Sequence, residues 1–222
     1  MHDVGIYENL ILGIHFLLLK KCKIFDEKTI VRCYTGRSMR INVRKHERRG
    51  YQSIKMSNIL EKQFLKQRND FEKSCVERDK KYHFPQGVIF ETDIAYAKDK
   101  NKAHRLDRYR PKGKEAQILP VIINVHGGGL LLGNKEFNKY FCALLSKKGF
   151  LVYSMEYRLI PDCTFFDQLR DIFLAMDFVR EHAAADGGDL SHVYLVGDSG
   201  GACLATYANA IQNSKKLQRQ RA

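Results

Sequence analysis

The 222-residue sequence lacks several patterns that would assign it to other classes of protein. Its six cysteines form no C-x-x-C pair and no framework spacing, which argues against a disulfide scaffold and favours reduced thiols in a cytoplasmic protein. It has no cluster of metal ligands and no phosphate-binding loop, so it predicts neither a metal nor another cofactor. These absences leave a globular protein whose chemistry comes from ordinary side chains.

Long hydrophobic runs are also absent. Near the N-terminus only Leu10–Leu19 is strongly apolar, and it is about half as long as a helix that spans a bilayer. The preceding residues 1–9 are acidic rather than basic, which argues against a signal peptide. We therefore expect a buried or lid-packing helix at Leu10–Leu19 and no stable membrane insertion. Contact with a membrane surface, helped by Lys20, Lys21 and Lys23, is the alternative.

Acidic residues are too few to balance the basic ones, and the formal net charge is +13. Most of the excess lies before Phe84 and in the last residues, with the densest basic run at residues 44–49. Nucleic-acid binding would explain such a balance, but no nucleic-acid-binding motif accompanies it and aromatic residues are not interleaved with the charge. The sequence therefore favours a solvated basic surface and no nucleic-acid partner.

The sequence does contain a serine between a predicted strand and a predicted helix. The apolar run Val193–Val196 is followed by G-D-S-G-G at residues 197–201 and then by the helix-forming run Ala202–Ile211. A sharp strand-to-helix turn exposes a serine hydroxyl, and its glycines keep side chains out of the bend. The N-terminus of the helix favours negative charge that develops beside the serine. The pattern predicts Ser199 as a nucleophile.

The same five letters occur in ordinary glycine-rich turns and in the serine motif of chymotrypsin-like proteases. Those proteases are all-β, whereas a helix-forming run follows Ser199 in this chain. Neither His126 nor His182 lies in the A-A-H-C pattern of those proteases. The context therefore argues against a protease of that class.

A second motif lies upstream and decides between a turn and a catalytic serine. The nearly continuous apolar run Leu119–Val125, typical of a strand buried on both faces, leads directly into H-G-G-G at residues 126–129. A glycine triplet after a buried strand can point backbone N–H groups at a reacting oxygen, as an oxyanion hole requires. The two motifs in this order favour a catalytic serine.

Together the motifs resemble those of the hormone-sensitive-lipase-like branch of the α/β-hydrolases, a family of carboxylesterases and lipases. The matching segments are residues 126–129, Y-R-L-I-P-D at 157–162, and 197–201, where the family usually has Y-R-L-A-P-E and G-D-S-A-G. The resemblance covers about Val88–Ala210. It implies hydrolysis of small-molecule carboxylic esters with short to medium acyl chains through an acyl-serine intermediate.

The resemblance also implies a role for each motif residue. Ser199 would be the nucleophile. The donors of the oxyanion hole would be the backbone N–H groups of Gly128, Gly129 and Gly200. The supporting residues of the motifs would be His126, Gly127 and Asp198. The glycine loop and Ser199 are therefore expected to converge.

The remaining pattern predicts an α/β-hydrolase fold, a doubly wound and mostly parallel sheet behind an N-terminal helical region. By analogy with the resembled family, residues 1–84 would form a helical cap and residues 85–222 a partial hydrolase core. Five strands are predicted, at Val88–Ala97, His104–Arg110, Leu119–Val125, Phe150–Met155 and Val193–Val196. The predicted helices are Asn58–Lys81, Lys135–Lys148, Phe165–Ala183 and Ala202–Ile211.

After Ser199 the sequence contains no aspartate, glutamate or histidine. The resembled family places the acid and the histidine of its catalytic triad there, in that order. We therefore expect the chain as given to be a truncated hydrolase that lacks the C-terminal strands and leaves one edge of the elbow strand unpaired. Two function classes follow: a carboxylic ester hydrolase in its full-length form, and a catalytically inactive fragment.

Overall fold

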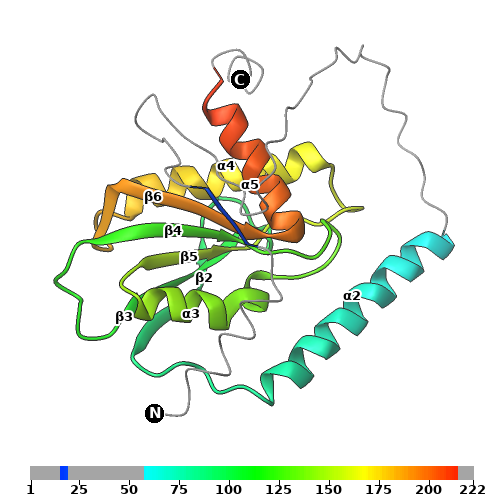
Figure 1. Ribbon diagram of the computed structural model, residues 1–222. Helices are drawn as coiled ribbons and strands as arrows, with labels where there is room; N and C mark the ends of the chain where they lie inside the picture. The colour runs from blue at the N-terminus through cyan, green and yellow to red at the C-terminus, as the bar shows by residue number, and fades with distance from the viewer. Residues whose placement is uncertain (1–15, 20–57, 215–222) are drawn as a thin grey trace.

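The computed structural model describes residues 16–19 and 58–214, and it arranges them as one sheet with helices on both faces (Figure 1). Six strands are hydrogen-bonded in the order β1-β6-β4-β5-β3-β2. The strands are β1 Phe16–Leu19, β2 Val88–Ala95, β3 Arg105–Pro111, β4 Leu119–Val125, β5 Leu151–Met155 and β6 Gly188–Asp198. The helices are α2 Asn58–Asp79, α3 Lys139–Lys147, α4 Phe165–His182 and α5 Ser199–Gln212, with a 3-10 turn η1 at Lys135–Asn138.

The central strands β4, β5 and β6 are parallel to one another. Strand β3 is antiparallel to both β2 and β5, and β1 is antiparallel to β6. Four of the six strands therefore run in the same direction, and the carboxyl ends of β4, β5 and β6 share one edge of the sheet. In α/β proteins this edge carries the site.

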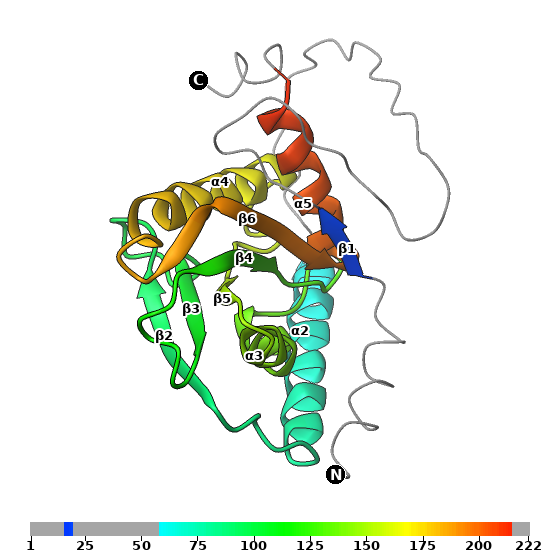
Figure 2. The ribbon, with the colours of Figure 1, turned by 60° about the vertical axis from the view of Figure 1, so that its left-hand side comes forward.

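Helices cover both faces of the sheet, with α4 and α5 on one side and α2 and α3 on the other (Figure 2). Alternate residues of the strands point to opposite faces. On β4, Ile123 packs in a cluster with Ile172 of α4 and Leu204 of α5, whereas its neighbour Ile122 packs with Cys142 of α3. This double burial explains why β4 is apolar along almost its whole length.

The structure confirms the predicted α/β-hydrolase fold, and every helix and strand predicted between residues 58 and 214 is present with small shifts at its ends. Strand β4 has the predicted bounds, and α2 ends two residues early, at Asp79. Strand β6 begins at Gly188, inside a segment that the sequence left as a turn. It does so because Gly188 and Asp189 pair with the start of β4 before the register shifts.

The predicted helix over Leu10–Leu19 is wrong for the four residues of it that the structure describes. Phe16–Leu19 form β1, with Phe16 opposite Asp198 and Leu19 opposite Leu195. A short apolar run fits a buried strand as well as a helix, so its periodicity could not separate the two. Strand β1 also corrects two further expectations, because the sheet has six strands rather than five and the outer edge of β6 is paired. The lysines at 20–23 and the basic run at 44–49 lie outside the described residues.

Helix α2 contacts the body of the protein through one face. Phe64, Phe71 and Cys75 are half-buried on the predicted apolar stripe, and Arg68 and Arg78 lie on the same face. The ring of Phe71 packs against the ring of Phe137 in η1, with centroids 5.1 Å apart. The role of this region as a cap remains a prediction.

Candidate active site

The serine elbow lies at the carboxyl end of β6. The strand ends at Asp198 and α5 begins at Ser199, whose φ of +45° puts a residue with a side chain in the left-handed region. The bend is tight, because a Cβ on Gly197 would lie 2.6 Å from the carbonyl carbon of Gly201. Ser199 is exposed. A strained and exposed serine between strand and helix is the arrangement that a nucleophile elbow requires.

Asp198 ties the elbow to the glycine loop, residues 126–129. Its buried carboxylate accepts a hydrogen bond of 2.9 Å from the Gly127 amide and one of 2.8 Å from the side-chain amide of Asn138. A Cβ on Gly127 would lie 2.2 Å from Asp198 Oδ2, so only glycine fits at that position. Asp198 therefore holds the end of β6 against the end of β4. Nothing in the sequence singled out Asn138.

Two glycines of the loop adopt positive φ angles, +120° at Gly128 and +62° at Gly129. A Cβ on Gly128 would lie 2.0 Å from the Leu132 carbonyl oxygen, whereas one on Gly129 would meet nothing within 4 Å. The Gly128 carbonyl accepts hydrogen bonds from the amides of Leu131 at 3.1 Å and Leu132 at 2.9 Å, which close the turn. Within residues 58–214, the amides of Gly128 and Gly129 donate no hydrogen bond.

The elbow and the glycine loop meet at Gly200. A Cβ on Gly200 would lie 3.1 Å from the Gly129 nitrogen and 3.0 Å from the Leu130 nitrogen. The Gly200 amide lies in the first turn of α5, where helix geometry provides no partner for it. An alanine, usual here in the resembled family, would displace the loop by a few tenths of an ångström. The fold thus brings the glycine loop against the residue that follows Ser199.

His126 is fully buried and both of its ring nitrogens are engaged. Nδ1 lies 2.8 Å from the Gly127 carbonyl oxygen and Nε2 lies 3.0 Å from a carboxylate oxygen of Glu156. The ring stacks on Tyr157, with centroids 4.2 Å apart, and the Tyr157 hydroxyl donates to the His126 carbonyl at 2.8 Å. These contacts fix the start of the glycine loop. The sequence analysis placed Tyr157 in the motif at 157–162 but did not identify Glu156, although it directly follows the predicted strand that ends at Met155.

A second serine, histidine and aspartate meet at the opposite end of β6. Ser191 Oγ donates to Asp189 at 2.5 Å, and His192 Nδ1 lies 2.6 Å from Asp189 and 3.1 Å from Ser191 Oγ. The Ser191 hydroxyl, followed by His192, lowers the pKa of Asp189 to about 2. Ser199 lies eight residues after Ser191, a separation of about 26 Å in an extended chain.

The Ser199 hydroxyl itself has no hydrogen bond to a histidine or a carboxylate among the residues that the structure describes. One turn further along α5, Cys203 is exposed, and partial burial of its sulfur raises the pKa of the thiol. A raised pKa keeps this thiol protonated at neutral pH, which makes it a poor nucleophile.

The loop that follows β5, residues 157–162, is held by two arginines. Arg158 donates to the fully buried Asp171 of α4, with a shortest contact of 2.7 Å, and this bond raises the pKa of its guanidinium. Asp162 pairs with Arg68 of α2 at 2.8 Å. The sequence analysis missed Arg68, whose only sequence signal is that it lies three residues before Phe71 on the stripe of α2.

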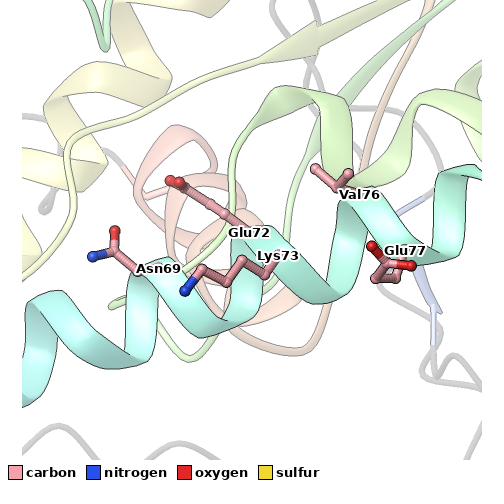
Figure 3. Close-up of a pocket in the computed structure, with 5 residues that line it drawn as sticks. All are labelled: Asn69, Glu72, Lys73, Val76 and Glu77. Carbon is pink, nitrogen blue, oxygen red and sulfur yellow. The ribbon is translucent and has the colours of Figure 1, made fainter.

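A surface hollow of about 340 Å³ lies along the exposed side of α2 (Figure 3). The side chains that line it are Asn69, Glu72, Lys73, Val76 and Glu77. All of them are exposed, and none belongs to the elbow or the glycine loop.

Among the described helices, none is both long and apolar enough to cross a membrane.

The fold and the serine elbow define an α/β-hydrolase of the carboxylesterase class. More narrowly, residues 106–222 match the BD-FAE family, and the chain belongs to it. This segment contains the glycine loop, the loop that follows β5 and the elbow.

Named relatives and solved structures agree with this class. The chain is 32% identical over 115 residues to the isoprenylcysteine alpha-carbonyl methylesterase ICME of Arabidopsis thaliana, covering 52% of this chain and 27% of the relative. It is 30% identical over 112 residues to the versiconal hemiacetal acetate esterase of Dothistroma septosporum, and this match covers 50% of this chain and 34% of the relative. Esterase B from Lactobacillus rhamnosis, solved with a C4-C4 tributyrin phosphonate, superposes with a TM-score of 0.70 at 30% identity, over 74% of this chain and 53% of the esterase. The chain thus spans about a third or less of these two curated relatives and about half of this solved structure.

Proposed function

We propose that these residues build the nucleophile and the oxyanion hole of a carboxylic ester hydrolase. Ser199 Oγ attacks the carbonyl carbon of an ester and gives a tetrahedral adduct. The bond to the alcohol oxygen then breaks, the alcohol leaves with a proton, and water later hydrolyses the acyl-serine. The observation that carries the proposal is the exposed Ser199 at φ +45°, with its neighbour Gly200 against Gly129, whose amide donates no hydrogen bond within residues 58–214.

The oxyanion of the adduct is assigned to the amides of Gly128, Gly129 and Gly200. Donors that are already in place and lack other partners stabilise developing charge without reorganising. The N-terminus of α5 adds its partial positive charge at the same point. His126, Gly127 and Asp198 support the loop through the contacts described above and do not take part in proton transfer.

A proton acceptor for Ser199 is the part of the mechanism that the described residues do not supply. His126 has both nitrogens engaged, and residues 200–222 contain no histidine, aspartate or glutamate. The base and the acid of the triad would therefore have to come from another segment. The same observation favours the second candidate, a catalytically inactive protein that keeps the elbow and the glycine loop.

The substrate class follows from the relatives and stays coarse. A methylesterase and an acetate esterase are among the curated relatives, and the esterase structure carries a phosphonate with C4 chains. We therefore propose a small-molecule ester with a short to medium acyl chain as the substrate, and no nucleic-acid partner. We also propose that residues 1–84 form a cap. A cytoplasmic location is a further proposal, and it rests on the absence of a disulfide spacing among the cysteines.

The test supplies the missing base. The 222-residue chain and a fusion that continues it with the C-terminal segment of Esterase B are assayed on p-nitrophenyl butyrate, each with and without Ser199→Ala. We expect the chain alone to remain near background, the fusion to turn over, and Ser199→Ala to abolish that turnover, because a serine without its base loses several orders of magnitude in rate. Turnover by the fusion that survives Ser199→Ala would overturn the assignment. A folded but inactive fusion would favour the inactive protein.

A further inference from the structure

Arg68 joins helix α2 to both loops that border the candidate site. Its Nε donates to the Leu131 carbonyl at 3.0 Å, and one terminal nitrogen donates to the Ile160 carbonyl at 2.9 Å. The other terminal nitrogen pairs with Asp162 at 2.8 Å. The side chain is only 18% exposed. Its three nitrogens are therefore bound to groups that are 63 to 94 residues away in the sequence.

The segment that Arg68 contacts is the turn that shapes the glycine loop. Leu131 lies inside the turn closed on the Gly128 carbonyl. The preceding residue, Leu130, has a φ of +71°, and its carbonyl accepts hydrogen bonds from the Ile160 amide at 3.0 Å and the Gln168 side chain at 2.9 Å. The turn that orients the amides of Gly128 and Gly129 is therefore held from outside by a few polar contacts, and Arg68 supplies one to this turn and two to the loop that follows β5.

Arg68 is not the contact that attaches α2 to the protein. Phe71 packs on Phe137, and Arg78 donates to the Phe137 carbonyl at 3.0 Å while lying over its ring, 5.3 Å from the centroid. Lys139 pairs with Asp79 at the end of the helix. None of these contacts is to Leu131, Ile160 or Asp162, so α2 has an anchor that is independent of Arg68.

On the basis of the proposed function, we propose that Arg68 is a positioning residue for the oxyanion hole. It holds the turn at Leu131 and the loop at Ile160 so that the amides of Gly128 and Gly129 keep a fixed direction. Oxyanion donors act through preorganisation, and a shift of about 1 Å is enough to lower a rate about 100-fold. Without the guanidinium, both carbonyls turn to solvent and the turn relaxes. Helix α2 thereby controls acyl transfer without touching the substrate.

The test compares Arg68→Ala and Arg68→Lys in the 222-residue chain with a matched control, Arg78→Ala, which removes an anchor of α2 but no contact to the glycine loop. The first readout is hydrogen exchange of the amides of Leu131, Leu132 and Ile160. We expect Arg68→Ala to speed their exchange about 10-fold or more, and Arg68→Lys to do so less, because open hydrogen bonds exchange faster. Arg78→Ala leaves their exchange unchanged.

The second readout is made in the fusion with the C-terminal segment of Esterase B, because the 222-residue chain is expected to stay near background. It is the labelling of Ser199 by a p-nitrophenyl phosphonate, in which Oγ bonds to phosphorus, p-nitrophenolate leaves and the hydroxyl proton goes to the base that the fused segment supplies. Arg68→Ala lowers the maximal labelling rate about 10- to 100-fold and changes the half-saturating concentration less than about threefold, since only the transition state uses the amides. Millimolar guanidinium restores the rate in Arg68→Ala but not in Arg78→Ala.

The outcomes separate the two proposals. If Ser199 of the folded parent fusion is not labelled, the proposed function fails, while hydrogen exchange in the 222-residue chain still tests the role of Arg68. If the parent is labelled and Arg68→Ala shows the same labelling rate or the same exchange at all three amides, the positioning role is wrong. Equal effects of Arg68→Ala and Arg78→Ala, or no rescue by guanidinium, would mean that Arg68 only anchors α2. Either result would also overturn the positioning role.

Discussion

The two ends of strand β6 carry serines in opposite settings. At the start of the strand, Ser191 has a histidine and an aspartate within 3.1 Å, yet it lies on ordinary exposed chain. At the other end, Ser199 has neither partner among the described residues, but it stands at φ +45° beside a glycine loop in which the amides of Gly128 and Gly129 donate no hydrogen bond within residues 58–214. The first group has the side chains of a triad without its backbone, and the second has the backbone without the side chains.

This difference shows that the backbone geometry around a serine is better evidence of a catalytic site than the presence of a neighbouring histidine and aspartate. In the Ser191 group the hydroxyl donates to Asp189, and His192 contacts both residues through the same nitrogen, Nδ1. A triad instead needs a histidine that bridges the acid and the serine through different nitrogens. Proximity of three residue types is therefore weak evidence of a site.

The largest expected effect contrasts the two serines. In the fusion with the C-terminal segment of Esterase B, Ser199→Ala should lower phosphonate labelling at least about 100-fold, because the nucleophile is lost. Ser191→Ala should leave the labelling rate and the labelled residue unchanged. Peptide mapping by mass spectrometry identifies the modified serine. If the label is found on Ser191 in the parent protein, the assignment of Ser199 as the reactive serine would be wrong.

The next contrast lies inside the glycine loop. Gly128→Ala forces a Cβ to within 2.0 Å of the Leu132 carbonyl at a φ of +120°, whereas Gly129→Ala meets only the strain of φ +62°. We expect a loss in the free energy of unfolding of about 3 kcal/mol for Gly128→Ala and about 1 kcal/mol for Gly129→Ala. Urea unfolding followed by circular dichroism measures both. Equal losses would mean that the turn is not packed as described.

The aspartates at the two ends of β6 should also differ. Asp198→Ala leaves the buried Gly127 amide without its acceptor and should lower the free energy of unfolding by about 1–3 kcal/mol. Asp189→Ala removes hydrogen bonds to the exposed Ser191 and His192 and should cost less than about 1 kcal/mol. Thermal denaturation of both variants beside the parent checks the order, and a larger loss for Asp189→Ala would contradict it.

The smallest effect depends on pH. Folding lowers the pKa of Asp189 to about 2 from an ordinary value of 3.8. Its contribution to stability is therefore fully present above pH 3.8 and is lost as pH falls through about 2. The difference in melting temperature between the parent and Asp189→Asn, at most a few degrees, should be constant from pH 5 to 7 and should shrink between about pH 4 and 2. If the difference in melting temperature grows as the pH falls, the prediction that the ionised Asp189 carboxylate stabilises the fold would be wrong.

Local patterns account for most of the fold that the sequence predicted. Strand β4 was placed without error because a run of seven mostly apolar residues ends at a glycine triplet. The elbow was located because strand, glycines and helix follow one another within twenty residues. Strand β1 was missed because four apolar residues have no period of their own, and only the outer edge of β6 decides their conformation.

The contacts that build the site were harder to predict because they join distant segments. Arg68 reads as one charge among many on a polar helix, and only the fold brings it within 3.0 Å of Leu131. Glu156 lies 30 residues from His126, and Asn138 lies 60 residues from Asp198. Motifs identify the residues that do chemistry, whereas the residues that hold them in place carry no signature in a single sequence.

The most direct test of the account is a crystal structure of the chain with Ser199 modified by a phosphonate. The phosphoryl oxygen stands where the oxyanion of the adduct would form. We expect it about 2.7–3.1 Å from the amide nitrogens of Gly128, Gly129 and Gly200, the range for oxyanion donors. An oxygen that points to solvent, with the three amides more than about 4 Å away, would contradict the account, since that separation is no hydrogen bond.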